Sequence, residues 1–171
     1  MSKRNQAYDE QNDASNNSSL QARKAASEPV ASLRGRALRL LARRDWSRDA
    51  LRAKLLSSTA DHDEGSEASA EVDELLDDFT SRGWLSDARY AQELVRSRQN
   101  RNGKTAIAQR LKRAGVSEAD AAAALSAIAP DQEYQTALTL WRRKFREPPA
   151  DEKEKARQVR FLQARGFGRS E

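Results

Sequence analysis

Apolar side chains recur at every third or fourth position through most of this chain, from about Leu33 onwards. Leu33, Ala37, Leu40 and Leu41 form the first of these stripes, and arginines occupy the positions around it. Residues three and four apart lie on one face of an α-helix, so this spacing predicts amphipathic helices. No segment of useful length alternates apolar and polar residues as a half-buried strand would. We therefore expect an all-α fold.

Capping residues indicate where several of these helices begin. Ser47 and Ser86 each precede an apolar stripe and can accept a hydrogen bond from the first turn of a helix. Ser117, with Asp120 three residues later, resembles a capping box. A further helix is expected from about Asp131 and another from about Asp151.

Glycines and prolines indicate where the helices end. Gly83, Gly115 and Gly166 each follow an apolar stripe, and glycine readily takes the left-handed conformation that ends a helix. Pro130 is expected to stop the helix that Ser117 begins, since proline cannot continue a helix interior.

A charged helical phrase returns along the chain with its apolar positions in register. Leu51, Lys54 and Leu55 are matched 56 residues later by Ile107, Arg110 and Leu111. A weaker third copy relates residues 111–116 to residues 162–167, 51 residues later. A period near fifty residues is typical of stacked helical units that share a core. We therefore expect an elongated, curved array of tandem three-helix repeats, right- or left-handed, that serves as a binding surface rather than a catalyst.

Changes in composition predict the domain boundaries. Residues 1–31 have almost no large apolar side chains, so burial cannot offset the entropy cost of ordering them. Residues 57–70 are small, polar and acidic, which predicts an inserted loop. We expect a disordered tail (1–31), a first repeat (33–84, with acidic loop 57–70), a second repeat (85–129) and a third repeat (131–171) that lacks its last helix.

The composition argues against several kinds of site. The 171 residues include no cysteine, so disulfides and thiolate metal sites are excluded. His62 is the only histidine and lies beside Asp61 and Asp63 in the acidic segment, where a rigid metal site is not expected. We recognise no phosphate-cradling glycine loop and no nucleophile paired with a base. We expect a protein that is not an enzyme and uses neither metal nor cofactor.

The chain has no apolar run of about 18 residues and nothing that resembles a signal peptide. We therefore expect a cytoplasmic protein without membrane contact.

The net charge of +5 conceals alternating basic and acidic blocks. Residues 33–56 carry +6, residues 57–78 carry −9 and residues 79–116 carry +7. Arginine supplies most of the basic excess, and its planar group suits phosphate and carboxylate contacts. We expect a set of cations, here called the basic track, to face a partner protein or DNA: Arg43, Arg44, Arg48, Arg52, Lys54, Arg96, Arg98, Arg101, Lys104, Arg110, Lys112, Arg113, Arg142, Arg143 and Lys144.

Any one of these cations alone could be an ordinary solvated side chain. Lys54 and Arg110, however, occupy the same position in two copies of the repeated phrase. The acidic helix at 71–78 is expected to pair with neighbouring arginines. It could instead meet a basic patch on a partner.

The three tryptophans, Trp46, Trp84 and Trp141, could stack on unpaired bases. Packing is the preferred interpretation, because Trp46 lies at a helix junction, Trp84 follows a glycine and Trp141 shares an apolar stripe. Tyr90 falls on a similar stripe and is expected to belong to the core, and Tyr134 shares one helix face with Leu138 and Trp141.

Several phrases of the sequence resemble the bacterial RecX family. They are residues 41–47 with 51–55, residues 85–91, and residues 157–167. The resemblance covers roughly residues 33–168. It implies tandem three-helix repeats that bind the RecA recombinase, lie along the groove of the RecA filament on DNA and restrain its activities in recombination, DNA repair and the SOS response. The acidic insertion and the short segment after Gly166 depart from the family pattern.

We expect a monomer that occupies the RecA filament, with DNA contacted inside it, and thereby hinders ATP hydrolysis, filament growth and strand exchange. The alternative is a basic helical protein that acts on bare DNA, because residues 105–125 can be read as a helix-turn-helix. Its second helix, however, offers acids and alanines rather than side chains that read base edges.

Overall fold

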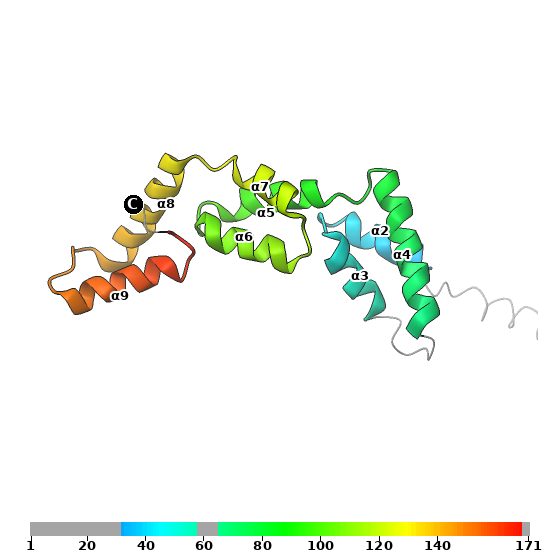
Figure 1. Ribbon diagram of the computed structural model, residues 1–171, viewed down its shortest axis with the longest axis horizontal. Helices are drawn as coiled ribbons and strands as arrows, with labels where there is room; N and C mark the ends of the chain where they lie inside the picture. Colours follow the sequence, from blue (N-terminus) through cyan, green and yellow to red (C-terminus); the bar gives the residue numbers. More distant parts are fainter. Residues whose placement is uncertain (1–31, 58–64, 169–171) are drawn as a thin grey trace, which may run out of the picture. The chain divides into compact units, whose positions relative to one another are not determined.

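The computed structural model describes residues 32–57 and 65–168, and these residues form eight α-helices and no strand (Figure 1). The predicted all-α fold is confirmed. The expected disordered tail lies outside the described residues, as do His62 and the two acids beside it. The helices are α2 (Leu33–Leu41), α3 (Arg48–Leu56), α4 (Gly65–Ser81), α5 (Asp87–Arg98), α6 (Lys104–Arg113), α7 (Glu118–Leu125), α8 (Pro130–Phe145) and α9 (Glu152–Gln163).

The predicted serine caps are confirmed. The Ser47 hydroxyl accepts a hydrogen bond from the backbone N–H of Ala50 at 3.3 Å, and that of Ser117 accepts from Asp120 at 3.1 Å. Ser86 caps α5 in the same way. Each serine satisfies a backbone donor that has no partner inside its own helix, which fixes the start of that helix.

The predicted glycine ends are confirmed as well. Gly83, Gly115 and Gly166 have φ angles of 70°, 75° and 81°. These lie in the left-handed region, where a side chain would be strained.

Two expectations about boundaries are wrong. Residues 65–70 were expected in an acidic loop, but they form the first turns of α4, whose alanines and glutamates favour helix. Pro130 does not stop α7, which already ends at Leu125; it occupies the first turn of α8 instead. Proline suits that position because its missing N–H would have no helical partner there.

The first core lies between α3 and α4. Leu51 and Leu55 from α3 are fully buried, together with Val72, Leu76 and Phe79 from α4. These residues follow the helical spacing of the sequence, so the two apolar stripes pack face to face.

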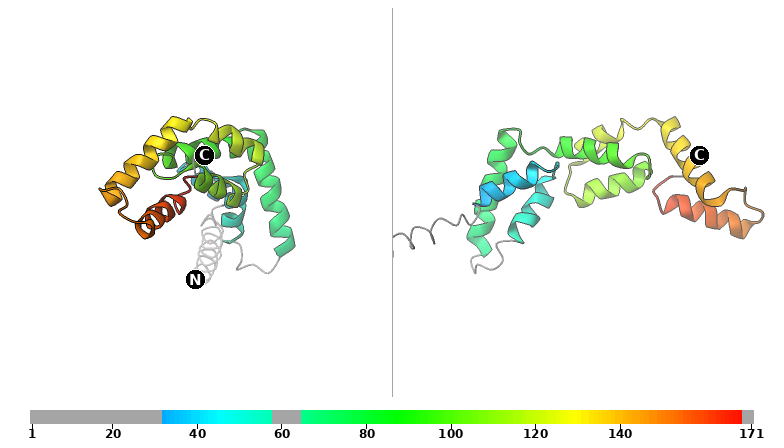
Figure 2. Two further views of the ribbon diagram at one scale, coloured as in Figure 1. Left: turned by 60° about the vertical axis from the view of Figure 1, so that its left-hand side comes forward. Right: turned by 180° about the vertical axis from the view of Figure 1, so that it is seen from behind.

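A second core lies among α5, α6 and α7, which are neighbours in Figure 1 and in both views of Figure 2. Its buried residues are Ala91, Val95, Ile107, Leu111, Val116, Ala124 and Ile128. Tyr90, which was expected to be core, is partly buried against this cluster. The small side chains of α7 allow it to approach the other two helices closely.

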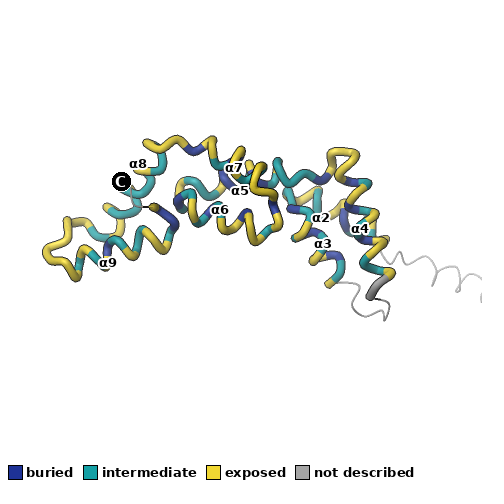
Figure 3. The backbone as a smooth tube through the Cα atoms, in the orientation of Figure 1, coloured by how far each residue is buried: buried dark blue, intermediate teal, exposed yellow. Residues whose placement is uncertain are grey.

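Helices α8 and α9 form a thinner pair. The rings of Phe145 and Phe161 meet edge to face at 5.2 Å, and Trp141 Nε1 donates to Gln158 Oε1 at 2.8 Å. No residue of α8 is fully buried, in contrast to α5 (Figure 3). Tyr134, on the apolar face of α8, is 58% exposed.

None of the described helices is both long enough and apolar enough to cross a membrane.

Candidate interaction surface

The N-termini of α3 and α6 are each held by a carboxylate from another helix. The backbone N–H of Arg48, the first residue of α3, donates to Asp87 Oδ1 at 2.8 Å. The backbone N–H of Lys104, the first residue of α6, donates to Glu133 Oε1 at 2.8 Å. Asp87 lies in the first turn of α5 and Glu133 in the first turn of α8. A carboxylate at a helix N-terminus satisfies a backbone donor and complements the positive end of the helix dipole.

The glycine turns bring α3 and α6 close to their partners a second time. A Cβ atom on Gly115 would lie 1.9 Å from Asp49 Oδ2, in the first turn of α3. A Cβ atom on Gly166 would lie 2.3 Å from the backbone nitrogen of Ala106, in the first turn of α6. Each joint therefore combines one carboxylate cap with one glycine turn, here called the first joint (Asp87 and Gly115) and the second joint (Glu133 and Gly166).

Two arginines of the basic track pair with carboxylates of α4 on the surface of the molecule. Arg52 Nε donates to Asp73 Oδ1 at 2.7 Å, and its second nitrogen donates to Asp73 Oδ2 at 2.9 Å. Arg48 pairs with Asp77 at 2.8 Å. The expectation that the acidic helix pairs with neighbouring arginines is confirmed.

The pKa values of this pair move in opposite directions. The hydrogen bond from Arg52 lowers the pKa of the Asp73 carboxyl, and the guanidinium charge lowers it further. The same hydrogen bond raises the pKa of Arg52. Both groups therefore remain charged at neutral pH.

The remaining cations of the first block differ in their contacts. The Arg44 guanidinium stacks over the Trp46 ring at 3.8 Å, and Trp46 Nε1 donates to the Leu40 carbonyl at 3.2 Å. The expected packing role of Trp46 is thus confirmed. Arg43 and Lys54 are exposed and take no part in an ion pair among the described residues.

Most basic-track residues of α6 and α8 lie in the last turns of these helices. Arg110, Lys112 and Arg113 are exposed in the last turn of α6, as are Arg142, Arg143 and Lys144 in the last turn of α8. Cations near a helix C-terminus complement its negative end, which gives these side chains a structural reason to be there.

The basic-track residues between the start of α5 and the start of α6 differ in exposure and in ion pairing. Arg96 pairs with Glu93 on the surface of α5, and Arg98 is half-buried. Lys104 is half-buried at the start of α6, while Arg101 is exposed. Along the described chain, ten of the fifteen track residues are exposed without an ion pair: Arg43, Arg44, Lys54, Arg101, Arg110, Lys112, Arg113, Arg142, Arg143 and Lys144.

The surface of α7 does not resemble a base-reading helix. Its exposed positions include Glu118, Ala119, Ala122 and Ala123. A recognition helix needs side chains that hydrogen-bond to base edges, and acids repel the phosphates beside them. These residues disfavour the helix-turn-helix alternative.

The other tryptophans have different environments. Trp141 packs between α8 and α9, as expected. Trp84 is 43% exposed, with its ring 5.4 Å from that of Phe79. Its packing is therefore only partial.

Sequence reasoning missed the carboxylates of the two joints. Neither Asp87 nor Glu133 is predicted from the sequence to cap another helix. They lie at different positions of their helices, the first residue of α5 and the fourth of α8, so no repeated spacing marks them. Arg89, which binds Asp45 and the carbonyls of Gly83 and Trp84, was missed for the same reason.

The described residues contain no group of three or more histidine, aspartate or glutamate side chains that could hold a metal ion.

Comparison with known proteins identifies a consistent set of relatives. Residues 86–125 match the family model described as the second three-helix domain of RecX, and residues 131–171 match its third three-helix domain. The regulatory protein RecX of Leptothrix cholodnii is 43% identical over 143 residues, which cover 84% of this chain and 86% of that protein. The RecX of Neisseria meningitidis serogroup C is 39% identical over 142 residues, covering 82% and 86%.

Solved structures agree with this fold. A crystal structure of regulatory protein RecX has a TM-score of 0.63 and 23% identity, and covers 86% of this chain and 72% of its own. RecX from Lactobacillus salivarius has a TM-score of 0.64 and 19% identity, and covers 81% and 88%. The sequence identities to the bacterial relatives extend over most of both chains, so this chain belongs to the RecX family of regulatory proteins.

Proposed function

We propose that this chain is a non-enzymatic regulator of the RecA recombinase, which binds along the groove of the RecA filament on DNA and restrains ATP hydrolysis, filament growth and strand exchange. Membership of the RecX family supports regulation of RecA in general. The observation that supports groove binding is the set of ten basic-track cations that are exposed and in no ion pair among the described residues. It acts in the cytoplasm as a monomer.

The charges of these residues suit such a groove. A RecA filament on DNA presents phosphates, and its protein surface offers carboxylates. Exposed arginines bind both kinds of anion, frequently through two parallel hydrogen bonds. Arg48 and Arg52 are less available for this role than the other cations, because their guanidinium groups already pair with Asp77 and Asp73.

The test is RecA ATP hydrolysis on single-stranded DNA while this protein is titrated to a near-equal concentration. The track variant carries Arg110→Gln, Lys112→Gln and Arg113→Gln, which removes three exposed charges from the last turn of α6. The matched control carries Lys153→Gln, Lys155→Gln and Arg160→Gln, which removes three exposed charges from α9, outside the basic track.

We expect the unsubstituted chain to slow ATP turnover in a dose-dependent way. The track variant should need at least about tenfold more protein for the same effect, since each lost charged contact contributes on the order of 0.5–1 kcal/mol. The control should remain within about twofold, a change below 0.5 kcal/mol. The proposal would be contradicted if the unsubstituted chain did not slow ATP hydrolysis. It would also be contradicted if the track variant and the control variant lost inhibition equally.

A further inference from the structure

Asn102 and Gly103 lie in the turn between α5 and α6, and they are the only asparagine–glycine pair in this chain. In such a pair the backbone nitrogen of the glycine can attack Cγ of the asparagine side chain, because glycine has no Cβ atom to hinder the approach. The new N–Cγ bond closes a succinimide ring, and the amide nitrogen of the side chain leaves as ammonia with the proton of the backbone nitrogen. Water then opens the ring to aspartate or isoaspartate, so the reaction needs no enzyme, oxidant or cofactor.

The fold withholds the nucleophile of this reaction. Gly103 is buried, and its backbone N–H donates to the Arg165 carbonyl at 2.9 Å. Asn102 is half-buried in the same turn. A backbone nitrogen whose proton is held in a hydrogen bond is not available to lose that proton and attack a side chain. The succinimide can therefore form only after the bond from Gly103 to Arg165 has broken.

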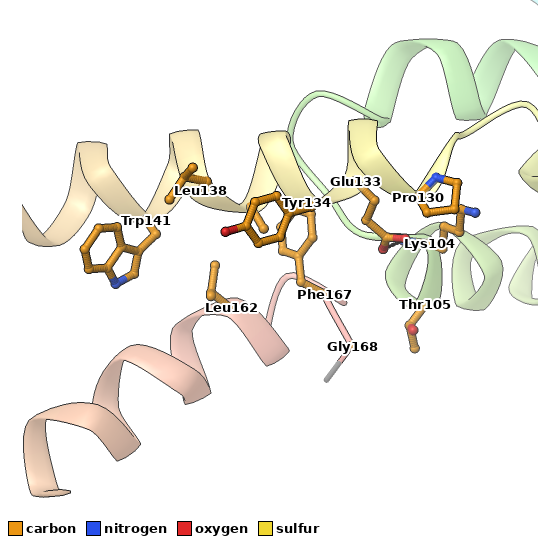
Figure 4. A pocket seen from close by; sticks show the side chains of 11 residues that line it. Lys104, Thr105, Pro130, Glu133, Tyr134, Leu138, Trp141, Leu162, Phe167 and Gly168 are labelled. Carbon is orange, nitrogen blue, oxygen red and sulfur yellow. Dashed lines mark hydrogen bonds between the residues drawn. The ribbon is translucent and has the colours of Figure 1, made fainter. Parts of the chain in front are cut away.

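The bond from Gly103 to Arg165 lies beside the second joint. The next amide along the chain, that of Lys104, donates to Glu133 Oε1 at 2.8 Å, and in Figure 4 Glu133 of α8 lies beside Lys104 at the start of α6. Gly166 directly follows Arg165 and approaches the first turn of α6. Because these contacts hold the same short stretch of chain, opening of the second joint frees the Gly103 nitrogen.

The closed joint has no room for an isoaspartate. A Cβ atom on Gly103 would lie 2.2 Å from the Gly166 carbonyl oxygen and 2.6 Å from the Phe167 backbone nitrogen. Backbone packs against backbone here, so neither side can yield as a flexible side chain would. Isoaspartate at position 102 routes the chain through the former side chain and inserts one more carbon atom into the backbone directly before Gly103. The joint cannot close around this longer backbone.

We propose that Asn102 is a deamidation site gated by the second joint, and that its conversion to isoaspartate keeps the joint from closing again. The closed joint protects Asn102, and a molecule whose joint opens for long enough loses this protection irreversibly. The modification thus releases the turn after α9 from α6 without cutting the chain. It does not depend on RecA being the partner.

The first experiment measures the rate of deamidation. The full-length protein is incubated in mildly alkaline buffer and then digested after glutamates, which gives a peptide of residues 94–118 for mass spectrometry. We expect Asn102 to convert at least about tenfold more slowly in the folded protein than in protein unfolded by guanidinium chloride. Asn100 lies in the same peptide and precedes an arginine, so it serves as the internal reference.

Two carboxylate variants test the gate. Glu133→Ala removes the acceptor at the second joint and should speed the conversion of Asn102 about fivefold. Asp87→Ala removes the corresponding acceptor at the first joint and should leave the rate within about twofold of that of the unsubstituted protein. Once unfolded by guanidinium chloride, both variants should convert at the rate of the unsubstituted chain, because the substitutions act only through the fold.

A second experiment tests the effect of the product on the joint. The variant Asn102→Asp has the negative charge of the product with an unchanged backbone, whereas the protein aged by incubation contains isoaspartate, which enzymatic methylation quantifies. We expect the Lys104 amide to exchange with solvent at least about tenfold faster in the isoaspartate form, as hydrogen exchange by NMR measures. In Asn102→Asp its exchange should stay within about twofold of the unsubstituted protein.

Three results would overturn the proposal. The gate is refuted if folded and unfolded protein convert Asn102 at the same rate. It is also refuted if Glu133→Ala and Asp87→Ala change that rate equally. The effect on the joint is refuted if the Lys104 amide exchanges as slowly in the isoaspartate form as in the unmodified protein.

Discussion

Individual arginines of the basic track differ in the contacts they make. Arg52 is bound by both carboxylate oxygens of Asp73, whereas Arg110 in the last turn of α6 is exposed and in no ion pair among the described residues. The sequence cannot distinguish them, because the pairing depends on α4 packing across α3 from 21 residues away. The sequence does predict which residues are cationic and on which helix they lie.

The Arg52–Asp73 pair makes the folded state sensitive to acid. The pKa of Asp73 is lowered below its ordinary value of 3.8 in the folded protein. A carboxyl with a lowered folded pKa adds stability above its unfolded pKa and loses it as the pH falls through the folded value. We expect Asp73→Asn to lower the melting temperature at pH 7, and the difference from the unsubstituted protein to be smaller at about pH 3, below the ordinary pKa of 3.8.

The measurement is thermal unfolding by circular dichroism at both pH values. Glu74→Gln is the matched control, since Glu74 is exposed and forms no ion pair with another described residue. A difference between Asp73→Asn and the unsubstituted protein that persists unchanged in acid would refute this account of the pair.

At the scale of elements, helix starts and ends were the most predictable features. Ser47, Ser86 and Gly115 act within one or two turns of their own position, so the helix ends that they fix can be predicted from the neighbouring sequence. Residues 65–70 were misassigned because their serines and acids suit a loop as well as a helix. Packing of α4 against α3, including the bond from Arg52 to Ser69, decides between the two.

The glycine ends of α4 and α9 differ in what surrounds them. Gly83 has nothing within 4 Å of a built Cβ atom, whereas Gly166 would place that atom against the backbone of Ala106. We expect Gly83→Ala to lower the free energy of unfolding by about 1 kcal/mol through backbone strain alone. Gly166→Ala should cost about 3 kcal/mol, because steric overlap adds to the same strain.

Urea denaturation of the two variants measures this difference. The positive φ angle is common to both sites, so Gly83→Ala controls for it. Equal losses of stability would mean that the close approach of Gly166 to α6 is not maintained in solution.

At the scale of the whole molecule, the repeat in the sequence is accompanied by a repeat of contacts, because the starts of α3 and α6 are held in similar ways. The period near fifty residues predicted that equivalent surfaces recur, and Leu111 and Leu162 occupy equivalent places after α5 and α8. The period did not predict the carboxylates of the two joints, which reach the helix starts from 39 and 29 residues away.

Removing the carboxylate of one joint should speed amide hydrogen exchange in that joint and leave the other joint unchanged. Glu133→Ala removes the acceptor for the Lys104 amide, and we expect that amide to exchange with solvent about fivefold faster, as loss of a hydrogen bond of about 1 kcal/mol implies. The Arg48 amide in the first joint should be unchanged. Asp87→Ala should give the reverse pattern. Hydrogen exchange by NMR measures both amides, and faster exchange at both sites in either variant would contradict independent joints.

The carboxylates at the starts of α3 and α6 also restrict how this molecule can hold a nucleic acid. Helix N-termini commonly bind phosphate through their backbone amides, but at these two ends Asp87 and Glu133 already occupy that position. Any phosphate met by these helices must be bound by arginine and lysine side chains near their opposite ends. Such contacts release counterions, so added salt should weaken them steeply and with little regard to base sequence.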